Sequence, residues 1–284
     1  NLHALAAARA AAVPEVRTRG LAARSDLPPL RVYCSEHAHS SIDKAVIMLG
    51  LGHAALAKIP VDDAFRMRAD ALGAAIQADR AAGVLPIAVV ASVGTTSSSS
   101  IDPVPAIADL CEAERIWLHV DAAYAGAAAM LPERAWIFDG VARADSVLVN
   151  PHKWLFTPID FSAFYCRRLD ALRAGLALTP DYLETSEAPT VRNLMDTGIP
   201  LGRRFRALKL WMVLRYFGAA GMRARLAEHI RLAQQFAGWV DADPDFERLA
   251  PAPLSVVCFR ATPRGFAGDA AGLDALTAAV LERV

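Results

Sequence analysis

Short apolar runs bounded by turn-forming residues recur along this chain. They lie at residues 30–35, 55–59, 86–92, 116–120, 146–149 and 162–166. The runs at 86–92, 116–120 and 146–149 are nearly continuous and contain β-branched residues, which is typical of parallel strands that are covered on both faces. The pattern therefore predicts a buried and largely parallel sheet.

Helical patterns separate these runs. Residues 2–13 are rich in alanine, which has a high intrinsic helix propensity. Residues 68–82 carry apolar positions at helical spacing, residues 104–114 form another helical segment, and Ser40 or Ser41 can cap the helix that follows the first strand. The alternation of strands and helices indicates an α/β fold.

The last third of the chain has a different organisation. A long amphipathic helix is expected to open at residues 199–206, to break at Gly218 and to continue as a second helix. Residues 256–260 then read as the first strand of a smaller unit. We therefore divide the chain into a large domain, residues 1–209, and the start of a small α+β domain, residues 210–284.

Two candidate catalytic residues lie where predicted strands end. Asp121 follows the apolar run at 116–120, and Pro151 stops the run at 146–149 so that Lys153 comes just past its end. In an open α/β sheet, ligands bind at the carboxyl ends of the strands. A lysine amine can hold the aldehyde of pyridoxal phosphate as a Schiff base, and a carboxylate can keep the pyridine nitrogen protonated. Spacing alone also fits an ordinary surface lysine and a structural aspartate.

The sequences that flank these two residues decide between the two interpretations. The segments 119–126 (HVDAAYAG) and 150–154 (NPHKW) resemble those of the group II pyridoxal-phosphate-dependent amino-acid decarboxylases, and most closely the aromatic-L-amino-acid decarboxylase branch. The resemblance extends from about residue 32 to about residue 230. It implies the aspartate aminotransferase type of fold (fold type I), with pyridoxal phosphate on Lys153 and Asp121 at the pyridine nitrogen. The implied reaction converts an aromatic L-amino acid to its amine and CO2.

The resemblance also assigns further cofactor contacts to this chain. His39, in the block Ala38-His39-Ser40-Ser41, would stack on the pyridine ring near the substrate carboxylate, and Ala123 would pack on the opposite face. Thr96 lies in a Gly-Thr-Thr block that contacts the cofactor. Asn150 and His152 would reach toward the phosphate.

Two more residues are assigned to the substrate. Tyr182 matches the tyrosine of a catalytic loop, and residues 176–193 read as such a loop because they lack a clean period and contain prolines. Tyr182 would donate the proton that Cα receives after CO2 leaves. Gly202 would help to set the size of the substrate pocket.

Charge and cysteine content exclude several classes of partner. Acidic and basic residues balance at 30 each, so no net field favours nucleic acid or an anionic membrane. No apolar run reaches the roughly 18–20 residues that a membrane span needs. Four scattered cysteines indicate a reducing cytoplasm. Cys34, His37 and His39 could suggest a metal site, but no matching second pair of ligands lies nearby.

Both ends of the chain look cut. It opens at Asn1 in one helical pattern and ends at Val284 in another. The resemblance implies three further parts: an N-terminal segment that packs on a partner subunit, a phosphate loop before the first helix, and more strands of the small domain. It also implies a homodimer with each active site at the subunit interface.

Four alternative functions remain in view. The substrate could be histidine or glutamate, but Gly202 argues against histidine and Trp154 matches the aromatic branch rather than the glutamate enzymes. An aromatic aldehyde synthase typically carries phenylalanine in place of Tyr182. The chain could also bind pyridoxal phosphate without chemistry, or use the Cys34, His37 and His39 cluster to bind a metal.

Overall fold

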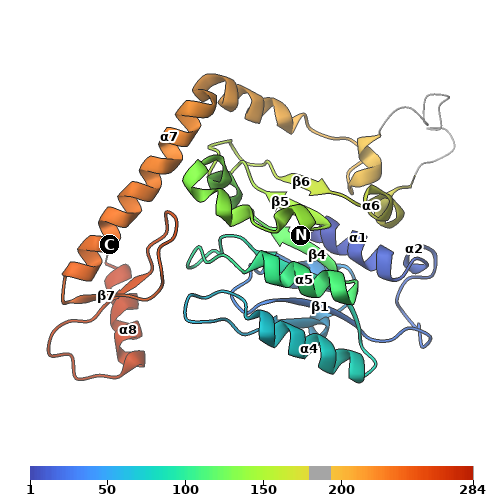
Figure 1. The fold of residues 1–284 in the computed structure, drawn as a ribbon, viewed down its shortest axis with the longest axis horizontal. Helices are drawn as coiled ribbons and strands as arrows, with labels where there is room; N and C mark the ends of the chain where they lie inside the picture. Colours follow the sequence, from blue (N-terminus) through green and yellow to red (C-terminus); the bar gives the residue numbers. More distant parts are fainter. Residues whose placement is uncertain (179–192, 284) are drawn as a thin grey trace.

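The computed structural model describes residues 1–178 and 193–283, whose core is a six-stranded sheet (Figure 1). The strand order is β2-β1-β3-β4-β5-β6. The bounds are β1 Leu30–Ser35, β2 Leu56–Ile59, β3 Leu85–Ser92, β4 Trp117–Asp121, β5 Ser146–Val149 and β6 Ala163–Cys166. Every neighbouring pair is parallel except β5 with β6, which are antiparallel. This arrangement confirms the predicted α/β fold with a mostly parallel sheet.

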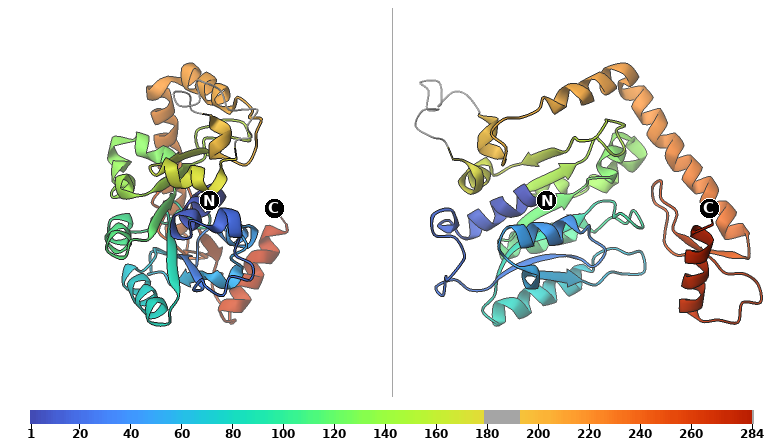
Figure 2. Two further views of the ribbon diagram at one scale, coloured as in Figure 1. Left: turned by 90° about the vertical axis from the view of Figure 1, so that its right-hand side faces the viewer. Right: turned by 180° about the vertical axis from the view of Figure 1, so that it is seen from behind.

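Helices cover both faces of the sheet (Figure 2). They are α1 Leu2–Ala12, α2 Val16–Arg19, α3 Ser41–Met48, α4 Ala69–Ala81, α5 Val104–Glu114 and α6 Leu169–Leu176. Successive residues of β3 supply the two resulting cores, because side chains alternate across a strand. Val89 and Ala91 pack with α4 and α5, whereas Ala88 and Val90 pack with α1, α3 and α6. This two-sided burial explains why the strand reads as a continuous apolar run.

Helices α1 and α6 pack closely on one side of the sheet. A Cβ atom at Gly175 of α6 would come within 3.1 Å of the carbonyl oxygen of Ala6 and 3.3 Å of the Cβ atom of Ala10. Small residues on both helices therefore permit the approach. The sequence did not predict α6, because its eight residues are few for a periodic pattern.

The chain leaves the sheet domain through α7, Arg206–Ala242, which begins later than predicted. Residues 199–205 precede the helix, because Pro200 and Gly202 disfavour helical backbone there. The predicted break is confirmed at Gly218, whose φ of 64° and ψ of 171° lie outside the helical range. Figure 1 shows the two arms of α7 meeting at an angle.

A small unit follows α7, made of the antiparallel strands β7 Phe246–Arg248 and β8 Phe259–Ala261 and the helix α8 Ala270–Leu281. The prediction that residues 256–260 form its first strand was wrong, because β7 comes earlier and pairs with β8. The second arm of α7 joins this unit to the sheet domain. Leu226 and Ile230 of α7 share one buried core with Leu254 and with Trp154 of the sheet domain.

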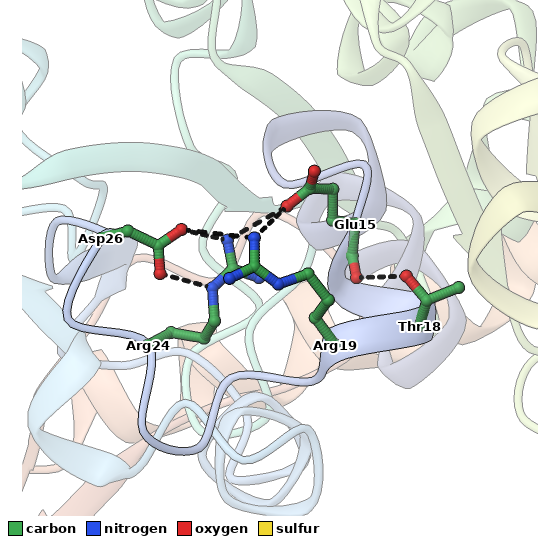
Figure 3. A network of polar contacts seen from close by, with 5 residues as sticks. All are labelled: Glu15, Thr18, Arg19, Arg24 and Asp26. Atoms are coloured by element: carbon green, nitrogen blue, oxygen red, sulfur yellow. Dashed lines mark hydrogen bonds and ion pairs between the residues drawn. The ribbon is translucent and has the colours of Figure 1, made fainter.

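The connection from α1 to β1 is held by ion pairs (Figure 3). Arg24 donates to Asp26 at 2.6 and 2.7 Å and to Glu15 at 3.3 Å, while Arg19 donates to Glu15 at 2.8 Å. The hydrogen bond from Arg24 lowers the pKa of Asp26 to about 2. These pairs fix the loop by which the chain enters the sheet. Within the described residues, no helix is long and apolar enough to cross a membrane.

Candidate active site

One edge of the sheet carries a cavity. Strands β1, β3, β4 and β5 are adjacent and parallel, so their carboxyl ends meet at this edge. The segments that leave those ends surround a cavity of about 460 Å³, a size common for ligand sites. Its lining includes all seven residues predicted to contact the cofactor: His39, Thr96, Asp121, Ala123, Asn150, His152 and Lys153.

Asp121 ends β4 and is 8% exposed. Its Oδ1 atom accepts the backbone N–H of Ala123 at 3.1 Å, and its Oδ2 atom accepts the side-chain amide of Asn1 at 2.8 Å. Each carboxylate oxygen has a second lone pair, so the group can still accept a hydrogen bond from a ligand. The carboxylate is thus oriented from both sides while it faces the cavity.

Lys153 lies in a turn that follows β5. The backbone N–H of Asn150 donates to the carbonyl oxygen of Ala123 at 3.0 Å, and the N–H of Lys153 donates to the carbonyl oxygen of Asn150 at 2.9 Å. The turn is therefore hydrogen-bonded to the segment that follows Asp121. Lys153 is exposed and lines the cavity.

The residue after Lys153 anchors the turn. Trp154 is 4% exposed and stacks on Tyr124, with ring centroids 4.7 Å apart and an interplanar angle of 9°. Its indole N–H donates to Nδ1 of His229 on α7 at 3.1 Å. The hydroxyl of Tyr124 is hydrogen-bonded to Ser255 of the small unit. The position of Lys153 is therefore coupled to the second arm of α7 and to the small unit.

His152 presents an N–H group. Its Nδ1 atom accepts the backbone N–H of Phe161 at 3.0 Å. The neutral ring must then carry its proton on Nε2. An imidazole N–H that lines the cavity is a suitable donor to a phosphate oxygen.

His39 is held in the same way by the start of α3. Its Nδ1 atom accepts the backbone N–H of Ser41 at 3.1 Å and lies 2.9 Å from the Ser41 hydroxyl. The predicted capping by a serine hydroxyl is wrong: Ser40 is the N-cap residue but makes no side-chain cap bond. The imidazole of His39 satisfies a free N–H of the helix instead, and this contact fixes the orientation of the ring.

The loop after β3 presents Thr96. Its neighbour Thr95 is buried, and the Thr95 hydroxyl is used within the loop by Ser98 at 3.0 Å and by the N–H of Ser100 at 3.0 Å. Thr96 is exposed and lines the cavity. Gly94 makes the tight turn possible, because its φ is 88° and a Cβ atom there would lie 2.5 Å from the Cβ atom of Ala125.

These residues fit pyridoxal phosphate. The cavity offers an amine for the aldehyde, a carboxylate for the ring nitrogen, and imidazole and hydroxyl groups for the remaining polar atoms. The Oδ1 atom of Asn150 is buried and has no hydrogen-bond partner among the described residues. A buried unpaired carbonyl oxygen is costly, and a bound hydrogen-bond donor would relieve that cost, whereas phosphate oxygens would be bound by the NH2 group of Asn150.

Other predicted residues lie elsewhere. Gly202 is exposed, lies outside the residues that line this cavity, and has no atom within 4 Å of where its Cβ atom would be. Tyr182 falls outside the described residues. The described residues contain no group of three potential metal ligands; Cys34 is buried and His37 packs edge-on against Phe65.

The sequence alone did not identify several polar residues of the cavity, among them Asn1 and Ser41. Asparagine just before a helix is ordinarily read as a cap, and Ser41 was read in the same way. The signal that separates a cap from a cavity residue is a side-chain partner distant in the sequence, which is Asp121 for Asn1 and Asn1 for Ser41.

The chain is similar in sequence to known proteins. The pyridoxal-dependent decarboxylase conserved domain matches residues 1–262. The chain is 41% identical to aromatic-L-amino-acid decarboxylase of Sus scrofa over 288 residues, which cover 100% of this chain and 57% of that protein. It is 40% identical to phenylacetaldehyde synthase of Arabidopsis thaliana, over 84% of this chain and 50% of that protein.

A solved structure shares the fold. The structure of Oryza sativa TDC with PLP and tryptamine superposes with a TM-score of 0.92 at 38% identity, over 99% of this chain and 58% of that one. The chain therefore spans about half the length of the relatives it matches.

Proposed function

Because the chain belongs to the pyridoxal-dependent decarboxylase family, we propose that the full-length protein decarboxylates an aromatic L-amino acid with pyridoxal phosphate. The products would be the corresponding amine and CO2. One observation carries the proposal: the amine of Lys153 and the carboxylate of Asp121 line one cavity at the carboxyl edge of a parallel sheet.

Each residue of the cavity would have a separate role toward the cofactor. Bound pyridoxal phosphate would supply an aldehyde and an electron-accepting ring. Lys153 would hold the aldehyde carbon through Nζ, and Asp121 would accept a hydrogen bond from the ring nitrogen and so favour its protonated form. His39 would cover one ring face, and Ala123, which has a small side chain, would allow close approach on the other.

The phosphate would accept hydrogen bonds from groups of this chain. His152 offers Nε2–H, because Nδ1 is already occupied by Phe161. The amide of Asn150 and the hydroxyl of Thr96 line the same cavity. These contacts would set the position of the ring against Asp121, and orientation of this kind accounts for much of the rate enhancement by enzymes.

Tyr182 is proposed to donate the proton that makes the product an amine. The phenol Oη would deliver it to Cα of the substrate after CO2 has left. The proposal rests on the resemblance of residues 179–183 (TPDYL) to the family's catalytic loop. Gly202 is proposed, on the same ground, to leave room for an aromatic side chain.

A second product class has support from the similarity to phenylacetaldehyde synthase. That activity would release aldehyde from the same substrates, and Tyr182 argues against it. Incubating the full-length protein with tryptophan, tyrosine, phenylalanine and dihydroxyphenylalanine distinguishes the two. Amine from at least one of them supports the proposal, and aldehyde as the sole product would replace it.

We further propose a homodimer with each active site at the subunit interface. Large apolar side chains between residues 199 and 216 are exposed here: Ile199, Leu201, Phe205, Trp211, Met212 and Tyr216. Exposed apolar side chains that gather in one short segment favour burial against a partner. Sedimentation of the full-length protein tests this, and a fully active monomer would contradict it.

We propose that the reaction takes place in the cytoplasm. All four cysteines are free thiols, which suits a reducing compartment. Fractionation of cells that produce the full-length protein would check the assignment.

A further inference from the structure

Asn1 occupies the N-cap position of α1 but does not cap it. Asparagine is among the best N-cap residues, yet this side chain makes no cap hydrogen bond. Its amide nitrogen donates instead to Oδ2 of Asp121 at 2.8 Å and to Oγ of Ser41 at 2.6 Å. Its Oδ1 atom lies 2.9 Å from Nε2 of His119.

A buried chain of hydrogen bonds continues from Asn1 into the sheet. His119 on β4 is completely buried, and its Nδ1 atom lies 2.9 Å from Oγ and 3.2 Å from the carbonyl oxygen of Ser146 on β5. The same Oγ atom accepts the indole N–H of Trp117 at 2.9 Å. Burial lowers the pKa of His119 to about 3, so its ring is neutral near pH 7.

The Asp121 end of this hydrogen-bond chain fixes the direction of its bonds. At the other end, the indole N–H of Trp117 can only donate and Oγ of Ser146 accepts it, but the hydroxyl keeps a second lone pair, so this contact by itself allows either direction between Ser146 and His119. The carboxylate of Asp121 can only accept, so the NH2 group of Asn1 must face it. Oδ1 of Asn1 then faces His119, which must carry its proton on Nε2. Nδ1 of the neutral ring is then an acceptor, and the hydroxyl of Ser146, 2.9 Å away, donates to it.

A branch of the chain reaches His39. Ser41 accepts a hydrogen bond from Asn1 through Oγ, so its hydroxyl proton is free to go to Nδ1 of His39, 2.9 Å away. The backbone N–H of Ser41 points at the same nitrogen. Nδ1 of His39 therefore faces two donors, and the proton of the neutral ring must be on Nε2.

We propose that Asn1 and His119 are positioning residues that orient Asp121 and His39 toward pyridoxal phosphate through this one directed hydrogen-bond chain. This hydrogen-bond chain starts in the buried core at Trp117 and ends on Asp121 and His39, the two groups that would contact the cofactor ring. Asp121 is held as an acceptor, and His39 is held with an N–H group available on Nε2. The inference rests on the proposed function, because it concerns residues assigned to the cofactor.

The first test needs no cofactor. In the full-length protein freed of pyridoxal phosphate, the 15N chemical shifts and N–H couplings of the His119 ring report which nitrogen carries the proton. We expect the Nε2–H tautomer near pH 7. A ring protonated on Nδ1, or on both nitrogens, would overturn the proposal whatever the protein's activity.

The second test measures the dissociation constant of pyridoxal phosphate by absorption titration. Asn1→Asp keeps the size of the side chain but replaces its NH2 group with an oxygen that faces Asp121. We expect binding to weaken about ten- to a hundredfold, the factor that a hydrogen bond to a charged group commonly contributes. Ser41→Ala spares the contact between Asn1 and Asp121, so it should weaken binding less.

Tyr33→Phe is the matched control. It removes a partly buried side-chain hydrogen bond, from the buried Tyr33 of the same sheet to Asp79 at 2.7 Å, and leaves the hydrogen-bond chain from Trp117 intact. A drop in melting temperature with unchanged cofactor affinity is expected for it. If Tyr33→Phe and Asn1→Asp weaken cofactor binding equally, or if Asn1→Asp binds within twofold of wild type, Asn1 has no positioning role.

The two tests separate this proposal from the proposed function. A protein that binds pyridoxal phosphate on Lys153 but shows the other His119 tautomer would retain the function and lose the positioning chain. Should Asn1→Asp fail to fold, His119 is still observed in the wild type, and Ser41→Ala still measures the branch to His39.

Discussion

Asp102→Asn should destabilise the loop that presents Thr96. Asp102 is 2% exposed, and its two carboxylate oxygens accept the backbone N–H groups of Met67 and Ser92, each at 2.7 Å. Its own N–H donates to the carbonyl oxygen of Ser92 at 2.9 Å. The side chain therefore closes the base of the segment from residue 93 to 101, and Asp102→Asn breaks one of these bonds.

The size of the effect follows from these contacts. An asparagine has one carbonyl oxygen, so one of the two N–H groups would face an NH2 group. A lost bond to a charged acceptor costs about 1.5–3 kcal/mol, and a buried N–H without a partner costs roughly 1–3 kcal/mol. Burying a neutral amide in place of a carboxylate offsets part of this loss. We expect the free energy of unfolding at pH 7 to fall by roughly 1–3 kcal/mol.

The pH dependence of the unfolding free energy gives a second, independent test. Burial raises the pKa of Asp102 to about 6, from 3.8 for a free aspartate. The folded state therefore holds an extra proton between about pH 4 and pH 6, and the stability from this group is lost as the pH rises through 6. Asparagine does not titrate. The free energy of unfolding of wild type should thus exceed that of the variant by about 1 kcal/mol more at pH 5 than at pH 7.

Urea unfolding of the full-length protein at pH 7 and pH 5 measures both quantities. The midpoint should shift while the slope stays constant, because the exposed surface does not change. Asp63→Asn, at an exposed position, is the control and should change stability by less than about 0.5 kcal/mol. An Asp102→Asn protein with the wild-type midpoint at pH 7, or an advantage that narrows at pH 5, would refute the reasoning.

Three further outcomes are expected. Borohydride reduction of the full-length protein with pyridoxal phosphate, followed by peptide mapping, should place the label on Lys153; label on another lysine would end the proposed mechanism. Gly94→Ala should cost about 1–3 kcal/mol of stability and weaken cofactor binding, because its Cβ atom would lie 2.5 Å from that of Ala125. Gly50→Ala, with a φ of 72° and open space, isolates the backbone contribution. Tyr182→Phe should slow amine formation about 10²–10⁴-fold and produce aldehyde, because the proton donor is lost; amine at the wild-type rate would make Tyr182 a packing residue.

The sequence by itself determined the sheet and the pair of residues at its edge. Strands β1 and β5 and helix α5 lie at the predicted bounds, since each is a short apolar segment with clear stops. Pro151 marks the end of β5, and this local signal located Lys153. The order in which strands meet was not readable locally, but residues at strand ends share an edge in any parallel arrangement. For that reason Asp121 and Lys153 could be paired before their neighbours were known.

Other features were decided by contacts between distant segments. Helix α7 begins at Arg206 rather than near residue 199, because Pro200 and Gly202 outweigh the amphipathic pattern. The side chain of Asn1 turns away from its own helix because Asp121 and His119, more than a hundred residues later, offer partners for all its polar atoms. A local rule assigns such a residue to the cap. The tertiary structure assigns it to the cavity, because a buried carboxylate and a buried imidazole must be satisfied and the helix N-terminus can be satisfied by other groups.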